Sequence, residues 1–253
     1  IKTIGETQMV FMDTPGLHKP TTKLSDHMLK AVRDAVSDID AVLFVQDCTK
    51  PLSQQEEELL GSLERAKTPV ILVLNKIDLC SDKTKLMQAI ASLNAAHTFA
   101  ATVPVSVTEN DGVDLVEQEV MALAQPAPHY FPDEKFTDQP ERVLAAEMIR
   151  EKILNLLRDE VPHGIAVSIE RMKERDDKDL LDIDATIYCE RESHKGILIG
   201  RHGTMLRKIA TLARKDLERF FYIQVNLQCW VKVKEDWRNK EGLIHNFGLD
   251  NPE

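Results

Sequence analysis

The sequence predicts an α/β domain with a doubly wound parallel sheet, followed by a smaller α+β domain. Three observations support this. Strand and helix patterns alternate as far as about residue 125, four prolines fall within residues 126–140, and the order of elements then changes. Alternating strands and helices favour parallel strands joined by right-handed crossovers. We therefore predict a first domain over residues 1–126, a linker over 127–140 and a second domain over 141–253.

In the first domain, strands are expected where apolar residues run together, and helices where they recur every three or four positions. Ser53 with Glu56 three residues later forms a capping box, which marks a helix start. The predicted strands cover residues 7–13, 40–47, 69–75 and, more weakly, 98–106. The predicted helices cover residues 23–36, 53–66, about 83–95 and 112–124.

The second domain has the predicted order helix, strand, strand, helix, helix, strand. A long amphipathic helix over 141–161 leads into strands at 165–175 and 180–191. A short helix, a long helix over 204–221 and a last strand at 224–235 follow. Trp230 falls in the middle of that strand and is expected in the core, whereas the sequence assigns no place to Trp237.

Charge is distributed unevenly along the 253 residues, whose net charge is −10. Residues 190–240 hold 12 Lys/Arg and 6 Asp/Glu, a net of +6, while residues 1–189 carry −13. The overall charge argues against a protein that coats nucleic acid along its whole length, and the asymmetry predicts two functions. The four cysteines show no metal-ligand spacing and are expected to be reduced thiols. No run of eighteen apolar residues occurs.

Two polar motifs follow predicted strands of the first domain. Asp13 ends one strand and is expected to hold Mg²⁺ through water, while Gly16 lets its N–H approach a γ-phosphate closely. In the motif N-K-I-D, Asp78 can accept two hydrogen bonds from the edge of guanine, which adenine does not offer. Asn75 can bond the base and tie neighbouring loops, and Lys76 can lay its alkyl stem along the purine. Both motifs are predicted at the carboxyl edge of the sheet, where ligands bind.

These motifs resemble those of the translation-factor-related GTPases, which have a Ras-like P-loop fold. Asp13, Thr14, Pro15 and Gly16 match the third guanine-nucleotide motif, and Asn75, Lys76 and Asp78 match the fourth. Ser106 and Val107 stand where the fifth motif usually has Ser-Ala, and a backbone N–H there would bond guanine O6. Leu17 replaces the water-orienting Gln of Ras-like enzymes. The resemblance implies a GTPase that binds GTP or GDP with Mg²⁺ and turns over slowly.

The phosphate-binding motif G-x-x-x-x-G-K-[ST] does not occur in the 253 residues. It would supply backbone N–H groups, a lysine and a Mg²⁺ ligand to the phosphates, and is expected a few dozen residues before Asp13. We expect that it was cut off ahead of Ile1 rather than lost, as it would be from a pseudo-GTPase. The polypeptide as it stands is predicted to be inactive.

The second domain carries Gly200-Arg201-His202-Gly203 between two predicted helices. A G-x-x-G loop in this order of elements is typical of the type II KH domain, which clamps single-stranded RNA by its backbone. Arg201 supplies charge, and His202 is expected to be a solvated side chain unless it contacts a base. The flanking basic residues are Lys195, Arg207 and Lys208.

The whole chain resembles the Era family of bacterial ribosome-assembly GTPases, through segments such as DTPGLHKP, NKID, CERESHKGILIGRHG and WVKVKEDWR. The resemblance implies a GTPase that binds the 3′ end of 16S rRNA in the small ribosomal subunit, with the nucleotide state controlling RNA binding. It also implies a cytoplasmic monomer, with peripheral contact at the inner face of the cell membrane. Two alternatives are a non-catalytic RNA-binding assembly chaperone and a double-GTPase acting on the large subunit, although the KH-like domain of the latter lacks the G-x-x-G.

Overall fold

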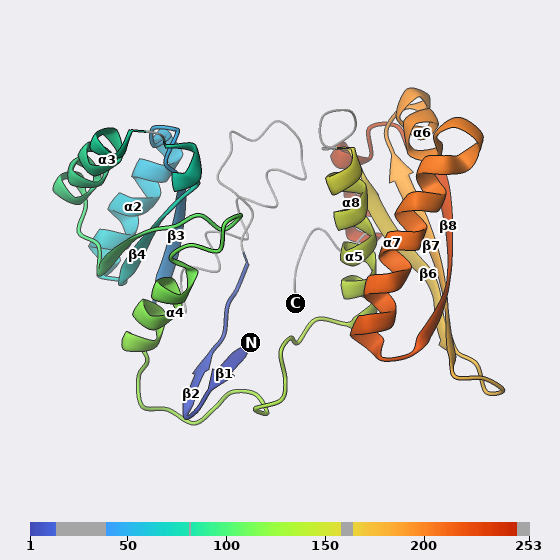
Figure 1. Cartoon of the computed structure of the whole chain (residues 1–253), viewed down its shortest axis with the longest axis horizontal. Coiled ribbons are helices and arrows are strands. Elements are labelled where there is room, and N and C mark those ends of the chain that lie inside the picture. The colour runs from blue at the N-terminus through green and yellow to red at the C-terminus, as the bar shows by residue number, and fades with distance from the viewer. Residues whose placement is uncertain (14–38, 81, 158–163, 247–253) are drawn as a thin grey trace. The chain divides into compact units, whose positions relative to one another are not determined.

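The chain folds into two compact units that part between Asp138 and Gln139 (Figure 1). The structure, a computed structural model, describes residues 1–13, 39–80, 82–157 and 164–246. The helix predicted over residues 23–36 lies outside these ranges. None of the described helices is long and apolar enough to cross a membrane.

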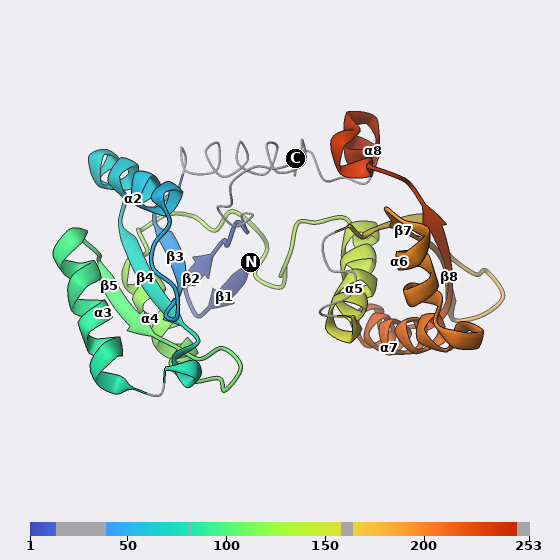
Figure 2. The same ribbon diagram turned by 90° about the horizontal axis from the view of Figure 1, so that it is seen from above.

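The first unit is built on a three-stranded parallel sheet in the order β3-β4-β5. Helices lie on both sides of this sheet, as Figure 2 shows, so the α/β class predicted from the sequence is confirmed. The strands are β3 (Val42–Asp47), β4 (Val70–Asn75) and β5 (Ala101–Pro104), and the helices are α2 (Gln54–Ala66), α3 (Lys83–Ala96) and α4 (Val113–Ala122).

The central strand β4 is buried on both faces, which explains its continuous apolar sequence. Leu72 packs in a cluster with Leu60 and Leu63 of α2. Ile71 and Val73 belong to a second cluster, against which residues of α4 pack. The two clusters hold the sheet between its helices and fix the carboxyl ends of the strands in place.

Helix α2 begins where the sequence predicted. The Ser53 hydroxyl accepts a hydrogen bond from Glu56 N at 3.3 Å, and the Glu56 carboxylate accepts one from Ser53 N at 2.6 Å. This reciprocal pair satisfies two N–H groups that a helix start leaves without partners. The helix ends at Lys67, whose φ of 59° is left-handed.

The strand predicted over residues 7–13 is shorter than expected. Only β2 (Thr7–Met9) forms, paired antiparallel with β1 (Lys2–Ile4). Residues 10–12 are apolar but exposed, with Met12 at 55%. No strand among the described residues pairs with this stretch, so its backbone groups lack the partners that would make it a strand.

The proline-rich segment has no helix or strand, but side chains of the first unit hold it. Gln8 donates to Phe131 O at 2.9 Å and accepts from Phe131 N at 3.0 Å. His129 contacts Glu6 O at 3.0 Å and the Asp133 carboxylate at 2.7 Å. These two acceptors raise the pKa of His129 above its ordinary value, the Glu6 carbonyl having the larger effect.

The second unit has one mixed sheet in the order β6-β7-β8, with β6 antiparallel and β8 parallel to β7. Helices follow the predicted order around it, so the KH-type α+β prediction is confirmed. The strands are β6 (Ala166–Glu174), β7 (Leu180–Cys189) and β8 (Gln224–Val233), and the helices are α5 (Glu141–Leu156), α6 (Glu192–Ile199) and α7 (Thr204–Phe221).

Helices cover one face of this sheet (Figure 1), and the core lies between them. Ile149 of α5, Ile183 and Ile187 of β7 and Leu217 of α7 are fully buried there. Alternate residues of β8 point into this core, and the residues between them face away from it. Trp230 belongs to the outward set and is 45% exposed, so the prediction that it lies in the core is wrong.

The segment after β8 folds back onto the second unit. It contains a 3₁₀ turn, η4 (Trp237–Asn239), and a short helix, α8 (Glu241–Asn246). Trp237 is only 1% exposed, and its indole N–H donates to Gly164 O at 3.1 Å. Arg238 beside it forms two bonds to the Glu190 carboxylate, at 2.9 and 2.7 Å.

Candidate nucleotide and RNA sites

The polar residues of the first unit gather because three parallel strands end at one edge. Asp47 and Asn75 are partners in the register of β3 and β4. Ser106 comes directly after Val105, whose N–H bonds to Leu74 O at 2.9 Å. The chain after β4 then forms a 3₁₀ turn, η2 (Ile77–Leu79). This turn, called the guanine turn below, carries Asp78.

Asp78 is held in place by a buried hydroxyl. The Ser106 hydroxyl donates to Asp78 Oδ1 at 2.6 Å, and Ser106 is 1% exposed. Asp78 itself is exposed. The bond therefore orients the carboxylate while the side chain stays open to a ligand. A carboxylate accepts up to about four hydrogen bonds, so capacity remains for two donors on one edge of a base.

Asn75 ties two loops together, as its sequence position suggested. Its Oδ1 accepts from Lys76 N at 2.7 Å and from Val107 N at 3.2 Å. The N–H of Val107, expected to bond guanine O6, thus donates to Asn75 in this structure. The contact fixes the spacing between the guanine turn and the loop after β5.

Asp47 is a member of this site that the sequence reasoning missed. Its Oδ2 accepts from Lys76 Nζ at 2.8 Å, and its Oδ1 accepts from Thr49 N at 3.0 Å and Thr49 Oγ1 at 2.7 Å. The bond from Lys76, followed by those from Thr49, holds the pKa of Asp47 well below its usual range. The ion pair fixes the direction of the Lys76 stem. The sequence did contain a signal for this role, since Asp47 is an acidic residue at the end of the strand predicted over residues 40–47.

Two cysteines flank the guanine turn, and the structure joins them in a disulfide. Cys48 follows β3 and Cys80 follows the turn, 32 residues later. The expectation that all four cysteines are reduced thiols is therefore wrong for this pair. The spacing of the cysteines in the sequence could not predict this disulfide, because the two residues meet only when β3 and β4 align. Among the described residues, no group of three or more His, Cys, Asp or Glu side chains could hold a metal.

The first predicted motif is described only at its first residue. Asp13 is exposed, and its carboxylate is the type of oxygen ligand that Mg²⁺ takes. Thr14, Pro15, Gly16 and Leu17 lie outside the described residues. The phosphate-binding motif is not in the sequence, and the inactivity of this polypeptide stays a prediction.

The loop between α6 and α7 has a backbone that only glycine adopts readily. Gly200 has φ 70° and ψ 173°, and Gly203 has φ 76° and ψ 14°. A Cβ on Gly200 would lie 2.7 Å from Met205 Cβ and 2.9 Å from Met205 N, whereas one on Gly203 would meet nothing within 4 Å. His202 between them is also left-handed, with φ 53°. The chain therefore turns sharply between the end of α6 and the start of α7.

Basic side chains surround this loop. Arg201, His202, Arg207 and Lys208 are exposed, and Lys195 lies 3.9 Å from the Glu192 carboxylate. The structure thus brings together the glycines and the charges that the sequence assigned to RNA binding. A loop backbone without side chains at its two glycines, with guanidinium groups beside it, can approach a phosphate chain closely.

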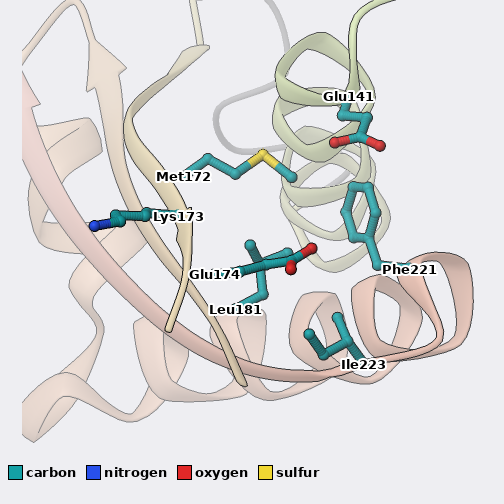
Figure 3. A pocket seen from close by; sticks show the side chains of 7 residues that line it. All are labelled: Glu141, Met172, Lys173, Glu174, Leu181, Phe221 and Ile223. Carbon is teal, nitrogen blue, oxygen red and sulfur yellow. The ribbon is translucent and has the colours of Figure 1, made fainter. Parts of the chain in front are cut away.

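The second unit also has a cavity of about 480 Å³ at the opposite end of α7. In Figure 3, Leu181, Phe221 and Ile223 point toward one another, while Lys173 points away. Phe221 ends α7, whereas the loop precedes its start, and eighteen helical residues span about 27 Å. The cavity is therefore separate from the loop. Its other lining residues are Glu141, Met172 and Glu174.

Comparisons with known proteins bear on both units. Residues 160–238 match the model of a KH domain, and residues 1–76 match that of a 50S ribosome-binding GTPase. The chain is 46% identical over 250 residues to GTPase Era of Clostridioides difficile strain 630, covering 99% of this chain and 84% of the relative. It is 44% identical to GTPase Era of Ruminiclostridium cellulolyticum, covering 96% and 81%.

Two solved structures align with this chain at a TM-score of 0.86 and 32% identity, covering 94% of it and 81% of each aligned chain. One is a variant of Era from Aquifex aeolicus bound to GDP·AlF4⁻. The other is Era in complex with MgGDPNP and nucleotides 1506–1542 of 16S ribosomal RNA.

Proposed function

The chain belongs to the Era family of GTPases, and on that premise we propose that it couples GTP hydrolysis to the binding of 16S rRNA during assembly of the small ribosomal subunit. One observation carries the proposal. A turn suited to guanine and a loop suited to an RNA backbone occur in one chain, in two separately folded units. Neither feature alone would distinguish an assembly factor from other GTPases or other RNA-binding domains.

In the nucleotide unit, Asp78 accepts hydrogen bonds from the N1–H and N2–H₂ groups of guanine. Ser106 holds the carboxylate from behind at 2.6 Å, so little conformational freedom is lost when the base binds. Lys76, directed by Asp47, lies along the purine face. Adenine has no matching pair of donors, so its binding would leave the Asp78 carboxylate without the two hydrogen bonds that guanine gives it.

The exposed carboxylate of Asp13 is an oxygen ligand of the type that Mg²⁺ takes, and it would hold the ion at the phosphate end of the site. When bound, the ion neutralises charge on the phosphates. In this proposal Thr14, Pro15, Gly16 and Leu17, which lie outside the described residues, complete the phosphate end of the site.

In the second unit, the loop binds single-stranded RNA at the 3′ end of 16S rRNA. Gly200 and Gly203 let the phosphate chain come close to the backbone, and Arg201, Arg207 and Lys208 supply positive charge. The glycines also argue against the double-GTPase alternative, whose KH-like domain lacks them. We further propose that the protein acts as a monomer in the cytoplasm, with peripheral membrane contact.

The test replaces Arg201 and His202 together by Asp. Carboxylates would then stand where phosphates bind, while the fold survives because both side chains are exposed. Affinity for single-stranded fragments of the 16S rRNA 3′ end should fall at least tenfold, about 1.4 kcal/mol. Both proteins are titrated at one fixed salt concentration, because phosphate contacts depend strongly on salt.

The control is the pair Lys173→Asp and Lys178→Asp, a comparable change of charge far from the loop on β6 and the turn after it. It should bind RNA nearly as the wild type does. Circular dichroism and GTP binding by the intact protein should be unchanged in both variants. Superimposable RNA titrations for the loop variant and the wild type would remove the loop from the RNA site.

A further inference from the structure

The disulfide between Cys48 and Cys80 encloses the residues that are proposed to read guanine. Cys48 N donates to Asn75 O at 2.9 Å, and Cys48 Sγ lies 3.2 Å from Lys76 O. Cys80 directly follows the guanine turn, and its N–H bonds to Ile77 O at 3.0 Å. The bond thus links the end of β3 to the far end of the turn that carries Asp78.

Apart from the disulfide, the guanine turn itself, from Ile77 onward, is held by contacts to the loop after β5. Ile77 N donates to Val105 O at 3.2 Å, and Asp78 accepts from Ser106. Within the residues that the structure describes, the other contacts on the β3 side reach only Asn75 and Lys76, which precede the turn, through Cys48 and Asp47. Breaking the disulfide would leave the end of the turn, from Asp78 to Cys80, in contact only with the loop after β5.

The two cysteines differ from the other two in their access to solvent. Cys48 and Cys80 are partly exposed, so a small reagent can reach them. Cys189 is fully buried, and burial raises the pKa of Cys229 to about 12. Thiolate is the reactive form, so Cys189 and Cys229 should be inert while the flanking pair reacts.

We propose that Cys48 and Cys80 form a reversible dithiol–disulfide couple that locks the guanine turn and slows the release of guanine nucleotide. The consequence for nucleotide release rests on the proposed function, whereas the lock itself does not. If the protein acts in the cytoplasm, as proposed above, a disulfide there is more often transient and redox-sensing than structural, which fits a reversible couple.

The oxidant is a low-molecular-weight disulfide, RSSR. One cysteine thiolate attacks a sulfur of RSSR, forming a mixed disulfide and releasing RS⁻. The second thiolate attacks the protein sulfur of that mixed disulfide, forms the Cys48–Cys80 bond and releases a second RS⁻. Two protein thiols are oxidised, RSSR is reduced to two RSH, and the two protons lost by the cysteines go to the leaving thiolates.

The first experiment equilibrates the protein in buffers of oxidised and reduced glutathione and maps the disulfides by mass spectrometry. Amide hydrogen exchange of the peptide spanning residues 76–80 is then compared between the two forms. We expect a single intramolecular Cys48–Cys80 bond and exchange at least tenfold slower in the oxidised form. The Cys48→Ser variant should show the fast rate in both buffers, and Cys189→Ser should behave like the wild type.

The second experiment measures the release of fluorescent GDP from the intact protein in the same buffers. Release should be at least threefold slower after oxidation, and this difference should vanish in Cys48→Ser. Absence of the bond, equal exchange in the two forms or equal release would each overturn the proposal. Failure of the reduced protein to bind GDP at all would instead contradict the proposed function, and the exchange measurement would still test the lock.

Discussion

The guanine turn and the G-x-x-G loop place functional groups by opposite means. In the turn, side chains hold other side chains, as Ser106 holds Asp78 at 2.6 Å and Asp47 holds Lys76 at 2.8 Å. In the loop, the backbone dihedral angles of Gly200 and Gly203 set the shape. The exposed side chains add charge but do not determine that shape. A substitution in the turn should therefore alter which ligand binds, whereas one at a loop glycine should alter whether the site forms at all.

The largest expected effect tests this difference at Gly200. Its dihedral angles lie in a region that is almost confined to glycine, and an added Cβ would meet Met205 backbone and side chain below 3 Å. Gly200→Ala should lower the free energy of unfolding of the second unit by about 3 kcal/mol and abolish tight RNA binding. Urea unfolding followed by tryptophan fluorescence measures it, since both tryptophans, Trp230 and Trp237, lie in this unit.

Gly203→Ala is the matched control for that experiment. Its φ of 76° is also left-handed, but an added Cβ would meet nothing within 4 Å. The cost should be only about 1–2 kcal/mol, that of a left-handed residue with a side chain. If both variants unfold at the same urea concentration, contact with Met205 does not explain the glycine at position 200.

A smaller effect is expected at the turn, and it concerns ligand choice. Asp78→Asn replaces an acceptor by a donor on the carboxylate position, so GTP should bind the intact protein about 2–3 kcal/mol more weakly while xanthosine triphosphate gains affinity. Competition binding with both nucleotides measures this. Asp82→Asn serves as the control, because Asn also caps the start of α3, where Asp82 accepts from Thr84 N at 2.9 Å. Unchanged GTP affinity in Asp78→Asn would remove Asp78 from the site.

The smallest expected effect concerns the sheet that supports the loop. Asp182 on β7 accepts two bonds from Arg175 and one from Asn226, all at 2.8 Å. The Arg175 guanidinium, followed by Asn226, holds the pKa of Asp182 well below its usual range. Because the folded state lowers this pKa, its stabilisation is full above the unfolded value of about 3.9 and is lost as the pH falls further.

The urea midpoint of the second unit, followed by tryptophan fluorescence, should therefore decline between pH 5 and pH 3. Asp182→Asn should flatten part of this decline, whereas Asp184→Asn, on the same face of β7, should leave it in place. Identical pH profiles for the wild type and Asp182→Asn would show that this ion pair does not contribute to acid sensitivity.

The sequence predicted those features that depend on local chemistry. The Ser53 capping box, the strand–helix alternation and the glycines of the loop each follow from a few neighbouring residues. Asn75, Asp78 and Ser106 could be assigned because strand ends meet at one edge of a parallel sheet. Family resemblance supplied the order of the motifs and the nature of the RNA.

What the sequence did not predict depends on contacts between distant segments. Cys48 and Cys80 are 32 residues apart and meet through the register of β3 with β4. Asp47 gained its role because Lys76 reaches it across the same pair of strands. The outward direction of Trp230 was available from the alternation of β8, but its place in the middle of the strand favoured the core. Met12 is exposed because apolar character alone does not supply a strand partner.

The anchoring of Trp237 bears on where the RNA-binding domain ends. Its indole is buried and bonded to Gly164, and Arg238 is paired with Glu190, so residues beyond the last strand are fixed to the segment before β6 and to the end of β7. The region that matches the KH model likewise extends to residue 238, five residues past the end of β8. A polypeptide trimmed at Val233 would keep every helix and strand of the motif, yet would lack the buried indole of Trp237. The smallest stable form of this domain is therefore expected to extend beyond its last strand.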